Sequence, residues 1–162
     1  MGSKLWGRLM QACGIAAALL IGIMTALVGY DVLARNTGLP APAGIAEASE
    51  YGLALTTLLA APWLMWSEAH VRLDLLQISL SPRAWARLYR AAAALCLLIS
   101  ATLAWYAVAV IVDLRASGAV VMKAFTFPEW WVYVPAPLCF GLIAVEALRQ
   151  LLRGPKPKAV TA

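Results

Sequence analysis

The chain has 162 residues, of which 63% are hydrophobic and 13% charged. Soluble domains average roughly 45–50% apolar and about 25% charged residues, so this composition excludes an ordinary soluble domain, a disordered segment and a disulfide-stapled secreted module. The formal net charge of +5 does not indicate a nucleic acid partner, because the basic residues gather at the ends of long apolar runs. We therefore expect an integral membrane protein surrounded by membrane lipids.

Four segments are long enough to cross a bilayer. The hydrocarbon core is about 30 Å thick, which requires about 20 apolar residues in a helix that rises 1.5 Å per residue. A lone segment in lipid must satisfy its own backbone hydrogen bonds, which favours helices over strands. The sequence predicts an all-α membrane protein, a single four-helix transmembrane domain over residues 1–162, with spans at about 9–33, 45–67, 88–112 and 129–152.

The first span is expected to be a retained signal anchor. Lys4 and Arg8 precede an apolar run of about 20 residues, longer than the apolar region of a cleaved signal peptide. The small triplet Ala16-Ala17-Ala18 lies inside that run and not after it. This arrangement does not resemble a cleavage site.

Prolines predict distortions in two spans. Pro62 removes one backbone hydrogen bond near the end of the second span, and Pro135 and Pro137 disturb the beginning of the fourth. We expect a kink in both, and the exact start of the fourth span stays open. The stretch 127–131 before it is expected either at the membrane interface or in a loose loop anchored by its aromatic residues.

The distribution of charge predicts the orientation. With the amino terminus inside, the inner segments hold ten basic residues and the outer loops hold three. Cytoplasmic loops carry the excess of Lys and Arg in membrane proteins. We therefore expect a multi-pass protein of the bacterial inner membrane with both termini in the cytoplasm.

Small residues recur every fourth position in two spans, which places them on one helix face and permits close packing. The first span carries Gly14, Ala18, Gly22 and Ala26 at this spacing, and the third carries Ala92, Cys96, Ser100 and Ala104. We expect the first stripe to be a helix contact face. Its partner is either another helix of this chain or another subunit.

The sequence offers little equipment for chemistry. The three cysteines are scattered in apolar runs, and the single histidine excludes bis-histidine haem ligation. No ionisable residue lies near the middle of a span, where proton relays place one. We therefore expect no enzyme activity, no catalytic residue, no cofactor and no metal ligand in this chain.

The connection between the second and third spans is amphipathic. His70, Arg72 and Asp74 are expected on the polar face of a short interfacial helix over about residues 70–80, which Ser81 and Pro82 end. The alternative is an ordinary extension of a spanning helix with solvated charges. One histidine and one carboxylate are too few for a closed zinc site.

The order of these features resembles a known family, the small (Q-type) membrane subunit of tripartite ATP-independent periplasmic (TRAP) transporters. The resemblance covers about residues 9–152 and rests on the following features in sequence order: Arg35 after the first span, Glu47 and Glu50 opening the second, His70 to Asp74 after it, and Pro128-Glu129-Trp130 followed by Tyr133 and Pro135 before the fourth.

The resemblance implies a non-catalytic role in a complex. In this family a periplasmic binding protein (P type) delivers an organic acid to the membrane, and the large subunit (M type) holds the substrate and sodium sites. The small subunit supports the large one and helps to dock the binding protein. Applied to this chain, the outer residues expected to bind partners are Arg35, Glu47, Glu50, Arg115, Glu129 and Trp130, and the inner ones are His70, Arg72 and Asp74.

Two other classes compete with this interpretation. An independent small carrier or channel that works as a homo-oligomer stays open as an alternative, whereas a membrane redox enzyme is disfavoured by the histidine and cysteine counts. The substrate is not encoded in this chain if specificity belongs to its partners.

Overall fold

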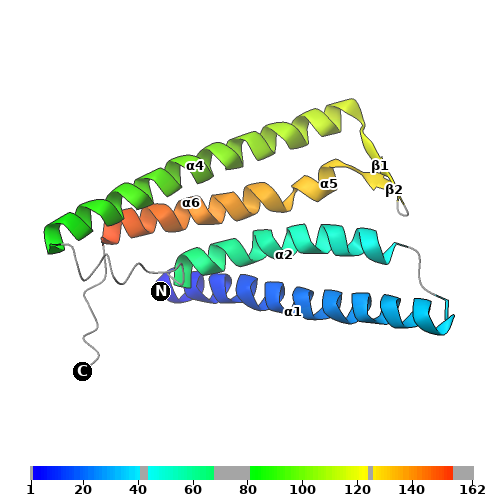
Figure 1. The fold of residues 1–162 in the computed structure, drawn as a ribbon. Helices are drawn as coiled ribbons and strands as arrows, with labels where there is room; N and C mark the ends of the chain where they lie inside the picture. The colour runs from blue at the N-terminus through cyan, green and yellow to red at the C-terminus, as the bar shows by residue number, and fades with distance from the viewer. Residues whose placement is uncertain (1, 41–43, 68–80, 124–125, 155–162) are drawn as a thin grey trace, which may run out of the picture.

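Four long helices form one elongated layer (Figure 1). The computed structural model describes residues 2–40, 44–67, 81–123 and 126–154. The long helices are α1 (Gly2–Thr37), α2 (Ile45–Ser67), α4 (Pro82–Ser117) and α6 (Pro135–Arg153). A small hairpin and the one-turn helix α5 (Trp130–Tyr133) connect α4 to α6.

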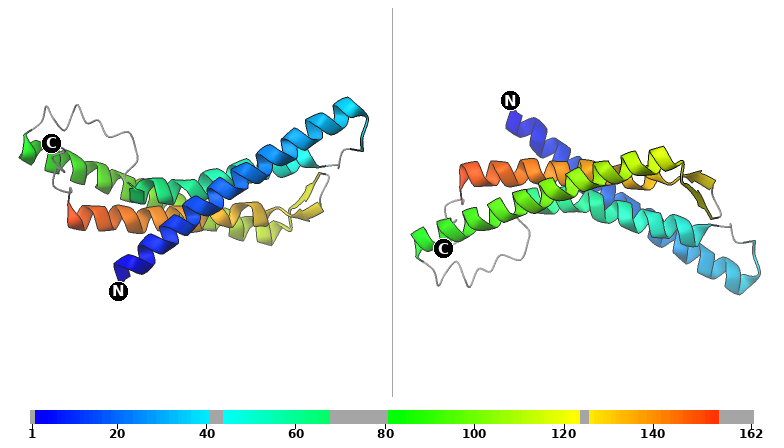
Figure 2. Two further views of the ribbon diagram at one scale, coloured as in Figure 1. Left: turned by 90° about the horizontal axis from the view of Figure 1, so that it is seen from below. Right: turned by 90° about the horizontal axis from the view of Figure 1, so that it is seen from above.

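The helices lie in the spatial order α1, α2, α6, α4, because α2 packs on both α1 and α6, and α6 packs on α4. Figure 2 shows α1 crossing the other three obliquely. In the most apolar stretch of each edge helix, α1 and α4, only 6% of the residues are buried against the rest of the chain. In the corresponding stretch of the segment that includes α6, 17% are buried. The layer is thus open on both faces and along both edges.

The two ends of the layer differ in content. One end holds the hairpin, α5 and the start of α2, and we call it the hairpin end. The opposite end holds the starts of α1 and α4 and the last turns of α2 and α6, and we call it the Trp6 end after the tryptophan in α1 (Figure 1).

Local sequence signals explain where the helices begin and end. The Ser81 hydroxyl accepts a hydrogen bond from the Ala84 N–H at 3.3 Å, and Pro82 occupies the first turn, where its missing N–H costs nothing. At the end of α1, Gly38 adopts a φ of 74° and the Leu39 N–H donates to the Ala34 carbonyl at 2.9 Å. This is a glycine-ended Schellman cap, which satisfies a carbonyl that the helix leaves free.

The hairpin was not expected from the sequence. Strands β1 (Val120–Met122) and β2 (Thr126–Pro128) pair antiparallel with Val121 opposite Phe127. The Glu129 N–H donates to the Ala119 carbonyl at 3.0 Å and closes the base of the hairpin. The chain therefore reaches α5 through an ordered element and not through a loose loop.

Two of the helical segments contain the prolines that predict kinks. In the last one α5 ends at Tyr133 and α6 begins at Pro135, but Val134 between them keeps helical dihedral angles (φ −54°, ψ −40°), so residues 130–153 form one nearly continuous helical segment. Pro62 is fully buried inside α2, which runs as one helix from residue 45 to residue 67. The kinks stay predictions.

Three helical segments among the described residues are long and apolar enough to cross a membrane: Lys4–Thr37, Arg83–Ser117 and Trp130–Arg153. Helix α2 has the predicted bounds but is not one of these three. The expected interfacial helix at about 70–80 lies outside the described residues.

Little of the apolar surface is buried inside the chain. The buried hydrophobic residues are mostly small and lie along the four long helices: Met10, Ala17, Ala34, Ile45, Ala93, Cys139 and Ala147. Large side chains such as Leu98 and Trp105 are 66% and 76% exposed. A continuous exposed apolar surface of this kind requires lipid or a protein partner.

Candidate functional site

The hairpin is attached to the start of α2 by a cluster of polar and aromatic contacts. The Lys123 ammonium donates to the Glu50 carboxylate at 2.8 Å and lies 5.3 Å from the centre of the Tyr51 ring. The Tyr51 ring in turn meets Phe127 edge to face, with centroids 5.7 Å apart. The hydrogen bond to Glu50 raises the pKa of Lys123 above its usual value, because it stabilises the charged ammonium.

A second contact holds the end of α4 to α5. The Arg115 guanidinium lies 4.3 Å from the centre of the Trp130 ring, and Trp130 meets Trp131 edge to face. A cation over an indole face is attracted by the ring's quadrupole. These two sets of contacts hold the connection between α4 and α6 against the start of α2 and the end of α4.

The structure brings together several, but not all, of the residues predicted to face the outside. Glu50 and Trp130 take part in the two contacts above, and Glu129 lies at the base of the hairpin. Glu47 lies in the first turn of α2. Arg35 is separate, because it pairs with Asp31 within α1 at 2.9 Å and is largely exposed.

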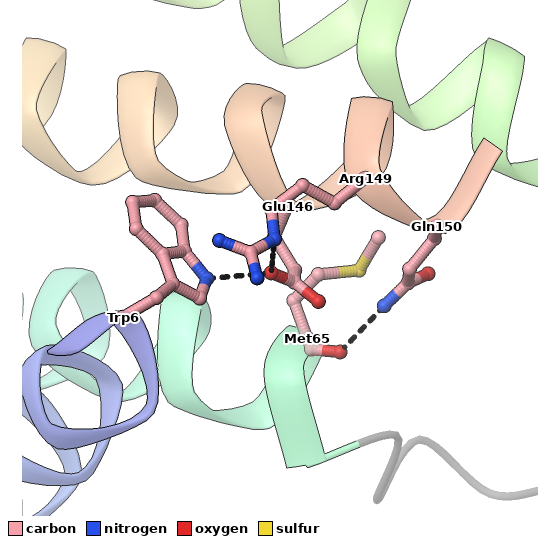
Figure 3. A network of polar contacts seen from close by, with 5 residues as sticks. All are labelled: Trp6, Met65, Glu146, Arg149 and Gln150. Atoms are coloured by element: carbon pink, nitrogen blue, oxygen red, sulfur yellow. Dashed lines mark hydrogen bonds and ion pairs between the residues drawn. The ribbon is translucent and has the colours of Figure 1, made fainter. Parts of the chain in front are cut away.

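The Trp6 end contains a polar network that joins three helices (Figure 3). The Trp6 indole N–H donates to the Glu146 carboxylate at 2.7 Å, across 140 residues of sequence. The Arg149 guanidinium lies 3.7 Å from the same carboxylate oxygen and 5.0 Å from the centre of the Trp6 ring. The Gln150 amide donates to the Met65 carbonyl at 3.0 Å in the last turn of α2, where helix carbonyls lack a partner.

This network changes the interpretation of two residues. The sequence predicts the local Glu146–Arg149 pair, which is confirmed, but places it at the water boundary. Glu146 is instead only 4% exposed and lies between helices. Trp6 precedes the first predicted span, a position typical of interfacial aromatic residues, and nothing in the sequence indicates that it donates a hydrogen bond to α6.

The small-residue stripe of α1 is only partly a contact face within this chain. A Cβ atom on Gly14 would lie 2.6 Å from the Trp63 ring, so glycine is required there for α1 and α2 to approach. Gly22 has open space at the same position, and Ala18 and Ala26 are exposed. A spacing of four residues drifts around a helix of 3.6 residues per turn, and the buried face follows Met10, Ala17 and Ala34 instead.

His70, Arg72 and Asp74 lie outside the described residues. Among the residues that the structure describes, no group of three metal-ligating side chains comes together. The described side-chain contacts join helices and the hairpin of this chain to one another.

A comparison with family models matches residues 24–156 to the DctQ component of the tripartite ATP-independent periplasmic transporters. The chain belongs to this family. Membership shows that the chain is a component of a transporter and not of an enzyme family, which agrees with the resemblance seen in the sequence. No curated protein and no solved structure matches the chain in the comparisons made.

Membership also gives a context to the open helix layer. A DctQ component is one part of a tripartite system and works with partner subunits. Exposed apolar side chains on both faces of the layer are the surfaces that lipid and such subunits would cover.

Proposed function

We propose that this chain is the small scaffold subunit of a sodium-coupled transporter that imports an organic acid delivered by a periplasmic binding protein. In this proposal it supports the large membrane subunit and helps to dock the binding protein. It contributes neither the substrate site nor the sodium site, which belong to the large subunit.

The observation that carries this proposal is how the hydroxyl groups at membrane depth are used. Thr25, Thr57 and Thr102 each donate to the carbonyl four residues earlier in their own helix, at 2.8–2.9 Å. Ser100 does the same to Cys96 at 2.7 Å. The hydroxyl of Thr56, at similar depth, is buried and has no hydrogen-bond partner among the described residues. Sodium and carboxylate sites need several converging oxygens and donors, whereas the four bonded hydroxyls lie on three different helices and no described hydrogen bond joins them to one another.

The proposed topology places all four long helices across the bacterial inner membrane with both termini in the cytoplasm. Helix α2 has 23 residues and therefore a length of about 35 Å, enough to span beside α1 and α6. An impermeant thiol reagent should then label Leu39→Cys but not Lys4→Cys in intact cells, in a background without the native cysteines. Labelling of the Lys4 position alone would reverse the orientation.

The hairpin end is the part of the chain that would meet the binding protein. It presents the acidic residues Glu47, Glu50 and Glu129 beside the cations Arg115 and Lys123. Charged groups at the rim of an interface steer a soluble partner and make association depend on salt.

Charge reversal tests this docking role. Glu50→Lys or Glu129→Lys in the complete complex should weaken docking of the binding protein roughly tenfold at low ionic strength, and the defect should shrink as salt screens it. Lys4→Glu changes charge by the same amount at the opposite end and should leave docking unchanged. The affinity of the isolated binding protein for substrate serves as a second control. Equal docking by all three variants would contradict the proposal.

Purification distinguishes this proposal from the independent carrier or channel. The tagged chain should bring down a much larger membrane subunit from its native membrane. A pure homo-oligomer that transports solute by itself would favour the alternative.

A further inference from the structure

The start of α4 carries a row of exposed arginines. Arg83, Arg87 and Arg90 follow one another at spacings of four and three residues, which places them on one face of the helix. Arg90 also lies beside the end of α6, since its Nη2 atom is 3.9 Å from where a Cβ on Gly154 would be. Arg153, the residue before that glycine, is exposed as well.

These charges have no acidic neighbour in the described part of the chain. The ion pairs found there join other residues: Arg35 with Asp31, Lys123 with Glu50 and Arg149 with Glu146. Guanidinium groups bind phosphate with paired, charge-assisted hydrogen bonds. The row therefore forms a basic patch that can accept an anion, and it lies beside the end of α6, which carries Arg153.

The same helix face continues as an apolar strip. Ala94, Leu98 and Ala101 follow Arg90 at spacings of four and three residues, and all three are exposed. The small side chains of the two alanines leave space beside Leu98 along this face. At 1.5 Å per residue, the distance from Arg90 to Ala101 is about 16 Å, close to half of a hydrocarbon core of about 30 Å.

Aromatic residues indicate the depth of the row in the membrane. Trp85 and Tyr89 are half-buried and alternate with the arginines along the first turns of α4. Tryptophan and tyrosine gather at the level of the lipid headgroups. The arginines thus lie at headgroup level, and the apolar strip lies at the level of the acyl chains of the same leaflet.

We infer that Arg83, Arg87, Arg90 and Arg153 bind the phosphate of an anionic phospholipid whose acyl chain lies along Ala94, Leu98 and Ala101. A free phosphate would use the arginines but not the strip, whereas a phospholipid matches both the charge and the length. With the proposed topology, the site lies in the cytoplasmic leaflet, where anionic lipids attract basic residues. The inference does not depend on the docking role of the opposite end.

Lipid titration of the purified full chain in a neutral detergent tests the site. Native mass spectrometry would follow binding of phosphatidylglycerol, phosphatidylcholine and glycerol 3-phosphate. Phosphatidylglycerol should bind the most tightly, and glycerol 3-phosphate should not bind measurably. Since guanidinium groups hold phosphate by paired, charge-assisted hydrogen bonds, Arg87→Gln combined with Arg90→Gln should weaken phosphatidylglycerol binding at least about tenfold.

A matched control removes the same charge elsewhere at the same end. Lys4→Gln combined with Arg8→Gln alters exposed basic residues of α1, at the other edge of the layer, and should change binding less than twofold. Circular dichroism should show equal helix content in both double variants. Equal loss in the two would show only general surface attraction and overturn the site.

Two further outcomes would also overturn it. Glycerol 3-phosphate binding as tightly as phosphatidylglycerol would indicate a soluble anion site. Unchanged lipid affinity in the Arg87 and Arg90 double variant, with the large subunit lost on co-purification, would show that the row contacts protein.

Discussion

Few side chains are buried between the helices, so single residues contribute strongly to the stability of their contacts. Glu146 is 4% exposed, and its described partners are the Trp6 indole and the Arg149 guanidinium. A buried carboxylate that loses a partner retains the cost of its desolvation. The Trp6–Glu146 contact is therefore expected to count for more than the exposed ion pairs elsewhere in the chain.

Trp6→Phe should destabilise the chain, because it keeps an aromatic ring but removes the N–H that Glu146 accepts. Loss of a hydrogen bond to a charged group costs about 1.5–3 kcal/mol. Trp105→Phe is the matched control, since Trp105 is 76% exposed and changes volume equally. Thermal unfolding of both variants in one detergent measures the difference. Equal melting temperatures would mean that the indole N–H does not contribute to stability.

Substitution by alanine is expected to have opposite effects on stability at two glycines of α1. Gly14→Ala places a methyl group against the Trp63 ring, and overpacking typically costs about 1–3 kcal/mol. Gly22→Ala meets no atom of this chain and should leave the fold intact or stabilise the helix by up to about 1 kcal/mol. Denaturation of the purified chain compares the two. A defect in Gly22→Ala that appears only in the assembled complex would show that this part of the stripe meets another subunit.

At the scale of elements, the sequence predicts helices better than their ends. The bounds of α2 agree with the prediction, whereas α1 and α4 run beyond the predicted spans at both ends. Counting apolar residues finds the part of a helix that lies in lipid and stops at charges such as Arg8. Backbone hydrogen bonding does not stop there, and the helix continues to a cap such as Gly38.

Side-chain contacts within one helix are predicted from the sequence, whereas contacts between helices are not. Asp31–Arg35 and Glu146–Arg149 are three or four residues apart, so helical spacing predicts them, and both are confirmed. Lys123–Glu50 joins residues 73 apart, and Trp6–Glu146 joins residues 140 apart. Such pairs depend on which helices are neighbours, which periodicity within one helix does not reveal.

The Lys123–Glu50 contact predicts a specific pH dependence of the hairpin. A raised pKa in the folded state means that the ammonium's contribution is fully present below its usual pKa of 10.5 and is lost as pH rises through the higher folded value. The distance between spin labels at Ala46→Cys and Met122→Cys, with the native cysteines replaced, should therefore stay constant from pH 6 to pH 9. Lys123→Gln should broaden the distribution of that distance at every pH. A distribution that broadens near pH 8 in the labelled protein that retains Lys123 would contradict the role given to the Lys123–Glu50 contact.

At the scale of the whole molecule, the open layer fits a component that others complete. The four helices bury small residues at their seams and leave both faces apolar and exposed. The hydroxyl groups of Thr25, Thr57, Ser100 and Thr102 bond to their own helices, and the charged residues gather at the two ends. The buried Thr56 hydroxyl has no hydrogen-bond partner among the described residues. This distribution supports the proposal that the chain holds partners in place and does not itself bind the transported solute.

Transport by the reconstituted system tests this central claim most directly. Vesicles would contain the large subunit with or without this chain, and the binding protein, loaded with substrate, would be supplied with a sodium gradient. We predict sodium-driven uptake only when this chain is present, with the affinity of the isolated binding protein for its substrate unchanged. Full uptake by the large subunit alone would show that the chain is dispensable and would contradict its role as scaffold and docking subunit.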